Sequence, residues 1–242
     1  MSAALLMASA FLSSPAQAQA LSCGAVVTTD VLLTQDLVGC TGDGLVVGAD
    51  GITVDLGGHT ISGTRGRRTA GIRLDGVDRV HVQGGTIASF DLGVYVNAST
   101  NVTVDTMVVQ SQRTDGVQVF NSQRFLLRDS DVTSSGRSGV VLQQSIAAVV
   151  RTNATNNGAE GFYSLGGRVF YLADVASGNA YGFNVQPYPG VAGATAWFRD
   201  SAAVDNLDYG YYFAAVTVTD AGGNSAANNG TACGPGICPL TL

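Results

Sequence analysis

Acidic side chains stand at repeated positions along this chain. Five of them lie one or two residues before a glycine that opens a repeating unit: Asp43, Asp91, Asp115, Glu160 and Asp208. Two carboxyl groups about 5–10 Å apart can act together in the cleavage of a glycosidic bond. Asp91, Asp115 and Glu160 border the face described next and are the catalytic candidates. Aspartate is also a common turn residue, because its side chain bonds the nearby backbone, and this structural explanation stays open.

A second set of side chains could bind a ligand rather than react with it. The second and fourth residues after each repeated glycine alternate with apolar residues, so they should point outward from a strand. Aromatic rings beside amides suit a ligand with apolar and hydroxyl faces, which a sugar chain has. The alternative is an ordinary solvated sheet surface. The candidate binding residues are Arg73, Asp75, Tyr95, Asn97, Gln118, Phe120, Gln143, Tyr163, Asn184 and Tyr212.

The only basic cluster of the sequence lies in the segment 64–70, which contains Arg65, Arg67 and Arg68. The segment enters just before an expected strand at Gly71, so it should flank the same outward face. Guanidinium groups bind carboxylates through paired hydrogen bonds, and these arginines could clamp an acidic polysaccharide. A flexible solvated loop is the other explanation.

The elements that would position these residues follow from a repeat. A glycine followed by an apolar-x-apolar triplet recurs at intervals of 21 to 28 residues, at Gly44, Gly71, Gly93, Gly116, Gly139, Gly161, Gly182 and Gly210. A second alternating stretch follows each triplet, and each unit closes through Asn, Gly, Ser and Asp. Two short strands of period two, without helical periodicity, predict a solenoid of β-coils. A propeller blade would need about 40 residues.

Composition agrees with this fold class and excludes some functions. The 242 residues include 32 glycines, one glutamate and no lysine, so the usual helix-surface residues are nearly missing. The formal net charge of −6 argues against nucleic-acid binding, which normally needs a basic face.

The segment Gly51-Ile-Thr-Val-Asp-Leu-Gly-Gly-His-Thr-Ile-Ser-Gly63 and the repeats after it resemble right-handed parallel β-helix proteins, the pectate-lyase-like superfamily. The resemblance covers about residues 44–232 and implies an all-β, right-handed, single-stranded parallel β-helix of about eight coils. Proteins of this architecture include polysaccharide lyases, glycoside hydrolases, uronate epimerases, adhesins and phage tailspikes. The resemblance is therefore specific for the fold and weak for the activity.

Both ends of the chain carry signals of export. Residues 1–20 are small and apolar and end in an A-x-A pattern, which predicts a signal peptide. Four cysteines allow three pairings, and we expect Cys23–Cys40 and Cys233–Cys238 in an oxidising compartment. The expected organisation is an N-terminal cap (21–43), a β-helix (44–220) and a C-terminal cap (221–242). We predict a secreted, periplasmic or cell-surface protein without a membrane span in its mature form.

Other reactive residue types are sparse. His81 lies on the second strand of its unit and should point outward, whereas His59 belongs to the turn-like GGHTISG segment. No ligand spacing for a metal is evident, and we expect neither metal nor cofactor.

These observations favour binding of an extracellular or cell-envelope polysaccharide through the outward strand face. The alternatives are a lyase, hydrolase or epimerase acting on an acidic glycan, and a structural surface or adhesin repeat protein. The oligomeric state is left open.

Overall fold

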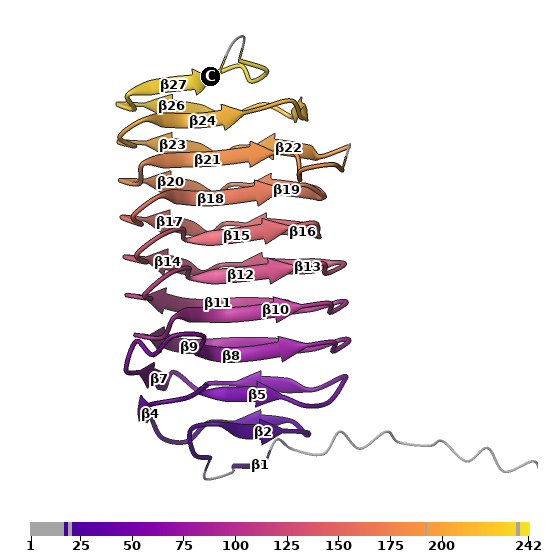
Figure 1. The fold of residues 1–242 in the computed structure, drawn as a ribbon, viewed down its shortest axis with the longest axis vertical. Helices are drawn as coiled ribbons and strands as arrows, with labels where there is room; N and C mark the ends of the chain where they lie inside the picture. Colours follow the sequence, from indigo (N-terminus) through magenta and orange to yellow (C-terminus); the bar gives the residue numbers. More distant parts are fainter. Residues whose placement is uncertain (1–16, 19–20, 192, 236–237) are drawn as a thin grey trace, which may run out of the picture.

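The protein is a solenoid made of strands. The computed structural model describes residues 17–18, 21–191, 193–235 and 238–242. The described elements are all β-strands, stacked in successive coils along one axis (Figure 1). The expected signal peptide (1–20) lies outside the described residues, apart from the two-residue strand β1 (Gln17–Ala18). Among the described residues, no helix is long and apolar enough to cross a membrane.

One face of the solenoid is a ten-stranded parallel sheet with one strand from each coil. The solenoid therefore has ten coils where the glycine repeat predicts about eight. The two further strands lie in the segments expected as caps, where β2 pairs with β5 and β27 pairs with β24. The strands are β2 (Ala25–Val27), β5 (Leu45–Val47), β8 (Ala70–Asp75), β10 (Leu92–Asn97), β12 (Val117–Phe120), β15 (Val140–Gln143), β18 (Glu160–Leu165), β21 (Tyr181–Gln186), β24 (Tyr209–Phe213) and β27 (Thr231–Gly234).

The other strands form a seventeen-stranded sheet that runs as two parallel columns joined by the long strands β9 (His81–Ala88) and β11 (Thr103–Gln110). Most coils therefore carry three strand segments, one more than the sequence pattern predicts. The first column also contains β3 (Val31–Leu32), β6 (Thr53–Asp55), β13 (Phe125–Arg128), β16 (Ile146–Val150), β19 (Arg168–Leu172), β22 (Thr195–Arg199) and β25 (Thr217–Asp220). The second also contains β4 (Leu37–Cys40), β7 (Thr60–Gly63), β14 (Asp131–Thr133), β17 (Asn153–Thr155), β20 (Val175–Ser177), β23 (Ala202–Val204) and β26 (Ser225–Ala227).

The core is a stack of apolar side chains, one layer per coil. Val94, Val117 and Val140 are cross-strand neighbours and are fully buried. The same column continues with larger rings, as Phe183 stacks on Phe162 at 4.9 Å and on Tyr211 at 5.0 Å. The predicted inward column and the predicted gathering of aromatic residues toward the C-terminal coils are both present.

Buried polar side chains close the coils at the turns. A ladder of asparagines follows the third strand segment, in which each Oδ1 accepts the backbone N–H of the residue at the same position one coil earlier. That residue is Ser135 for the first asparagine and the preceding asparagine for the others: Asn157, Asn179, Asn206 and Asn229. Each Nδ2 donates to a backbone carbonyl, as Asn179 does to Ala154 at 3.0 Å. These bonds satisfy backbone groups that would otherwise be buried without a partner. The ladder fixes the register in which residues of successive coils meet.

Candidate functional site

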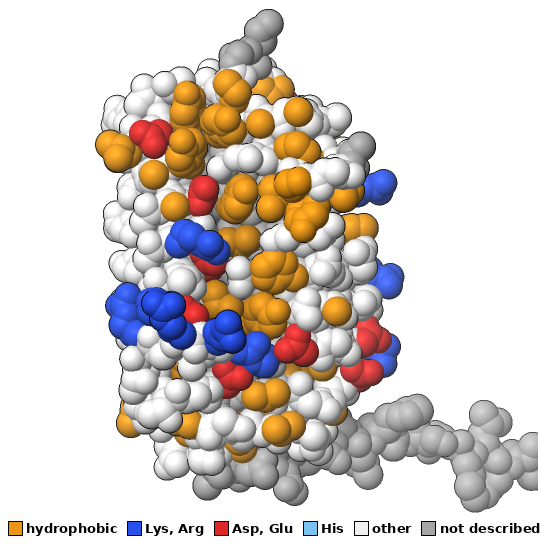
Figure 2. All heavy atoms as spheres, viewed as in Figure 1, with side chains coloured by type: hydrophobic (Ala, Val, Ile, Leu, Met, Phe, Trp, Pro, Cys, Tyr) orange, Lys and Arg blue, Asp and Glu red, His pale blue; other side chains and the backbone are white. Residues whose placement is uncertain are grey.

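The outward face of the ten-stranded sheet holds a groove of about 310 Å³. Figure 2 shows basic side chains gathered on one side of this face, with acidic ones among them and hydrophobic ones continuing above. The groove spans four coils and joins candidate residues of both kinds, catalytic and binding. It is lined by Arg68, Arg73, Asp91, Leu92, Tyr95, Thr114, Asp115, Gln118 and Arg137.

Asp115 is fully buried and forms the floor of the groove. The guanidinium of Arg137 binds it through two nitrogens, with Nε 2.8 Å from Oδ1 and Nη2 in contact with Oδ2. The backbone N–H of Ser138 donates to the same carboxylate at 3.1 Å, and Gln118 Nε2 lies 3.3 Å from it. The hydrogen bond to Asp115 raises the pKa of Arg137 further above its ordinary value. Every oxygen of this carboxylate is therefore engaged.

Asp91 connects the groove to the basic segment. Its Oδ2 accepts the backbone N–H of Arg68 at 2.6 Å. Its Oδ1 accepts from Arg113 Nε at 3.1 Å and from the Thr114 hydroxyl at 3.2 Å. The Asp91 carboxylate thus holds the loop that carries Arg65, Arg67 and Arg68 against the edge of the sheet. This is the position beside the outward face that the sequence predicts for the loop.

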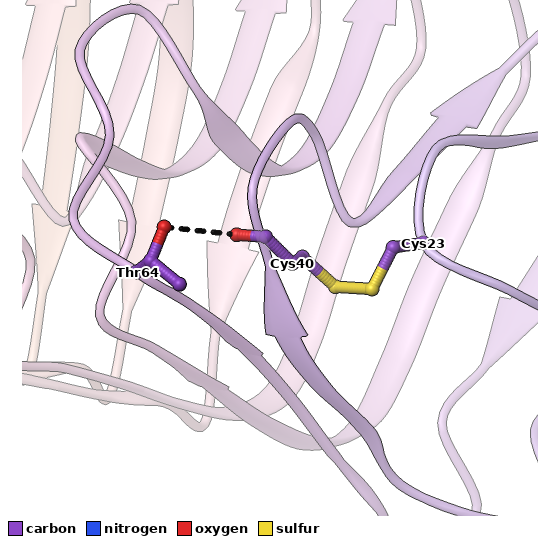
Figure 3. The surroundings of a disulfide bond; sticks show 3 residues. All are labelled: Cys23, Cys40 and Thr64. Atoms are coloured by element: carbon purple, nitrogen blue, oxygen red, sulfur yellow. Dashed lines mark hydrogen bonds between the residues drawn. A yellow bond between two sulfur atoms is a disulfide. The ribbon is translucent and has the colours of Figure 1, made fainter.

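The N-terminal disulfide supports the other side of this loop. Cys23 is bonded to Cys40, and Thr64, at the start of the basic segment, donates its hydroxyl to the Cys40 carbonyl at 3.4 Å (Figure 3). The second disulfide joins Cys233 to Cys238. Both predicted pairings are confirmed, and the described residues contain no free cysteine.

Arg73 lies across the lower end of the groove. It donates to Asp43 through Nε at 2.6 Å and Nη2 at 3.1 Å, and its guanidinium carbon lies 5.0 Å from the ring centroid of Tyr95. The bond to Asp43 raises the pKa of Arg73. Burial, followed by the nearby charge of Asp75, raises the pKa of the Tyr95 phenol, which is neutral at ordinary pH. The contact between the Arg73 cation and the Tyr95 ring, together with the bonds to Asp43, holds both side chains in place at this end of the groove.

The upper coils of the same face carry a tyrosine cluster. Tyr181 stacks on Tyr209 at 5.6 Å, and Tyr212 meets the edges of both at 5.8 and 5.3 Å. Glu160 lies in the same column, where Ser138 Oγ donates to it at 2.7 Å and Asn184 Nδ2 at 3.2 Å. Asn184 is only 4% exposed, so it supports Glu160 from beneath the surface rather than facing a ligand.

The remaining candidates extend the face at its far edge. Phe120 lies 6.2 Å from the Tyr95 ring, and Asn97 donates to Asp75 at 3.0 Å. Gln143 is the cross-strand neighbour of Phe120, and Tyr163 follows on the next coil. The structure therefore brings the predicted binding residues onto one continuous surface, with Asn184 alone below it.

Sequence reasoning missed the arginines that bind the groove aspartates. Arg113 and Arg137 stand 22 residues after Asp91 and Asp115, and Arg151 stands 22 residues after its partner Asp129. That separation equals one coil, so a search for opposite charges one repeat apart would have found all three pairs. Among the described residues, no group of three or more His, Cys, Asp or Glu side chains could hold a metal ion.

Comparison with known proteins identifies the class of this solenoid. The family model described as the right-handed β-helix region matches residues 43–190. Since this is more than half of the 242 residues, the chain belongs to the right-handed β-helix family. The β-solenoid predicted from the glycine repeat, and the right-handed β-helix class implied by the resemblance, are thereby confirmed. No curated protein matches the sequence.

Solved structures share this fold at low identity. The chain is similar to pectate lyase Pel9A, with 16% identity, a TM-score of 0.61, and coverage of 80% of this chain and 58% of that chain. It is also similar to the Azotobacter vinelandii mannuronan C-5 epimerase AlgE4 A-module, with 12% identity, a TM-score of 0.50 and coverage of 91% of each chain. The chain thus spans little more than half the length of the pectate lyase, and these likenesses show the fold alone.

Proposed function

We propose that this protein binds an acidic extracellular polysaccharide along the outward face of the ten-stranded sheet. The observation that carries the proposal is the groove itself, in which arginines, the Tyr95 ring and the Gln118 amide share one surface. The two disulfides support a location outside the reducing cytoplasm, in the periplasm or beyond the cell.

Charge supports an anionic ligand. Five of the twelve arginines lie in the groove or on its loop, in a chain whose net charge is −6: Arg65, Arg67, Arg68, Arg73 and Arg137. The three on the loop are exposed, and the ion pairs of the described residues involve none of them. Exposed guanidinium groups held on an anchored loop suit the carboxylates of a uronic acid chain.

The aromatic residues support a carbohydrate ligand in particular. Tyr95, Tyr163 and Tyr212 lie partly exposed along one sheet, on β10, β18 and β24. Each offers a flat apolar surface with a hydroxyl at its tip, and Gln118 and Gln143 add donors and acceptors beside them. A sugar ring presents apolar C–H faces and hydroxyl edges, which match this alternation.

Affinity measurements on three tyrosine variants test this assignment. Tyr95→Ala, Tyr163→Ala and Tyr212→Ala should each weaken binding of the polyuronate retained best in a glycan panel, by about twofold to tenfold. Phe170→Ala is the matched control, because Phe170 is an exposed ring on the other sheet. Unchanged affinity in all three tyrosine variants would overturn the assigned face.

Catalysis on the same ligand is the second candidate, as a lyase, hydrolase or epimerase. Asp91 and Asp115 line one groove on successive coils, which is the observation in its favour. Against it, both carboxylates are engaged by arginines and backbone N–H groups. Two measurements on a polyuronate incubated with the protein decide between binding and catalysis. Mass spectrometry detects the products of a lyase or hydrolase, and proton nuclear magnetic resonance detects C-5 epimerisation, which leaves the mass unchanged; binding alone produces neither change.

A further inference from the structure

An apolar hollow lies on the outward side of the larger sheet, away from the groove. It has a volume of about 300 Å³ and is lined by aliphatic and aromatic residues of β16, β19 and β22. Arg199, which is paired with Asp200, is the only charged residue among the described ones that line it. The hollow therefore offers an apolar ligand contact without offering hydroxyl groups a hydrogen-bond partner.

The outward side chains of four neighbouring strands form the walls of a gap at one end of this hollow. Leu126, Ala148, Phe170 and Trp197 are successive cross-strand neighbours on β13, β16, β19 and β22. Neighbouring strands lie about 4.8 Å apart, so Leu126 and Phe170 are separated by roughly 10 Å along the axis. Only the methyl group of Ala148 stands between them, which leaves a gap one coil high.

The Phe170 ring presents one face to this gap. Its other face stacks on the Trp197 ring, with the centroids 4.5 Å apart and the planes 9° from parallel. Trp197 lies on the coil after Phe170 and Ala148 on the coil before it, so the second face of Phe170 is uncovered. At 45% exposure, Phe170 is the most exposed aromatic residue of the described chain. A planar ring placed over Ala148 would continue the stack.

An accessible cation stands beside the gap. Arg168 is exposed and lies two residues before Phe170 on the same side of β19, about 7 Å along the strand. The ion pairs of the described residues do not include Arg168, whereas Arg151 and Arg199 are each paired with an aspartate. The guanidinium of Arg168 is thus within reach of an anionic group attached to a ring in the gap.

We propose that this hollow binds a small aromatic carboxylate. The ring lies over Ala148 between Leu126 and Phe170, and the carboxylate accepts hydrogen bonds from Arg168. A single unpaired guanidinium matches a single negative charge, and the hydrocarbon lining disfavours a hydroxyl-rich sugar. The site belongs to the larger sheet, so it stands whether or not the groove of the ten-stranded sheet binds a polysaccharide.

Nuclear magnetic resonance with methyl-labelled alanine tests the position of the ring. The Ala148 methyl signal, identified by its loss in Ala148→Leu, should move upfield as phenylacetate is added, because the methyl group would lie under the face of the ring. The shift should saturate with a dissociation constant on the order of millimolar. Benzyl alcohol, which has the ring without the charge, should bind about threefold to tenfold more weakly. Acetate and galacturonate should leave the signal in place.

Variants separate the ring contact from the charge contact, with saturation transfer to the ligand ring protons as the measure of affinity. Arg168→Gln should weaken phenylacetate binding about threefold to tenfold and leave benzyl alcohol binding unchanged. Arg67→Gln, at another exposed arginine without an ion pair, is the matched control and should change neither.

Filling the gap tests the shape of the site. Ala148→Leu should weaken binding of both ligands at least about tenfold, although it removes no cation and no ring. Ala202→Leu, at a partly exposed alanine on β23, is the control and should keep the original affinity. If circular dichroism shows that Ala148→Leu is unfolded, Phe170→Leu replaces it, with an expected weakening of about twofold to tenfold.

Four outcomes would overturn the aromatic carboxylate site. The first is phenylacetate affinity that stays equal in Ala148→Leu, or in Phe170→Leu where that variant replaces it. The second is benzyl alcohol binding as tight as that of phenylacetate, or an Arg168→Gln variant that binds phenylacetate unchanged. The third is an Ala148 shift that galacturonate reproduces. The fourth is an Ala148 signal that moves with protein concentration alone, since a second copy of the chain would then cover this face.

Discussion

At the scale of single residues, the groove carboxylates act first as anchors for arginines. Asp43, Asp91 and Asp115 each bind the guanidinium of an arginine one coil later. Because arginines and backbone N–H groups engage both oxygens of each carboxylate, the first effect of these carboxylates is to orient the cations. This arrangement explains how an acidic protein can present a cationic groove.

Replacing Asp115 by asparagine should destabilise the fold. The change removes charge-assisted bonds to Arg137 and Ser138, and we expect the free energy of unfolding to fall by about 1.5–3 kcal/mol. Asp129→Asn breaks an exposed pair with Arg151 and should cost about 0–1 kcal/mol. Urea unfolding of both variants measures the difference. Equal losses would show that the burial of Asp115 has no energetic consequence.

Removing one loop charge should weaken polyuronate binding without affecting the fold. Arg67→Gln, at an exposed position, should lower the affinity about twofold to fivefold in dilute salt and less in high salt, since added ions screen the contact. Arg124→Gln, another exposed arginine outside the groove, is the control. Titration calorimetry at two ionic strengths provides the comparison. A loss in both variants alike would indicate only a general charge effect.

At the scale of elements, buried polar side chains lie at the corners between strand segments. Asp174 follows β19 and is fully buried. Its Oδ1 accepts the backbone N–H of Thr152 at 2.9 Å and its Oδ2 that of Leu172 at 3.0 Å. Ser201 and Asn224 occupy the same corner on the following coils. Desolvation outweighs these hydrogen bonds and raises the pKa of Asp174 to about 8.

This buried carboxyl should make stability depend on pH. Its pKa in the folded state, about 8, lies above the unfolded value of 3.8, so its contribution is fully present below pH 4 and is lost as pH rises toward 8. Asp174→Asn should be less stable at pH 4, because its amide nitrogen cannot accept from Leu172. The deficit should shrink by about 1–3 kcal/mol at pH 8. Urea unfolding at both pH values measures this change.

Asp131→Asn, at an exposed position on β14, is the control for that experiment and should show the pH profile of the unchanged protein. A constant deficit in Asp174→Asn across the pH range would mean that the carboxyl ionises in the fold as it does in water.

At the scale of the whole molecule, a solenoid depends on its ends. Each coil contacts mainly the coils before and after it, so the first and last coils have a partner on one side only. The two disulfides lie in these end regions, with Cys23 just before β2 and Cys233 within β27. They oppose fraying where the stack is weakest.

Loss of the disulfides should therefore act locally. Cys23→Ser with Cys40→Ser opens a loop with a sequence separation of 17, and the end coil should lose about 3 kcal/mol. The C-terminal pair has a separation of 5, so its removal should cost less, about 2 kcal/mol. Hydrogen exchange should quicken in β2 and β5 of the first variant while β12 and β15 stay protected. Equal acceleration along the whole chain would contradict this repeat-by-repeat stability.

The sequence by itself determined the β-solenoid, the inward apolar columns, the outward face and both disulfide pairings. These depend on short-range patterns: alternation along a strand, glycine where backbones approach, and cysteines close in the chain. At Gly93, for example, a Cβ atom would lie 2.4 Å from the Gly116 carbonyl oxygen. The tertiary structure alone decided how deep each side chain lies. It buried Asp115 and Asn184, because the depth of a side chain depends on how successive coils stack, which no single repeat encodes.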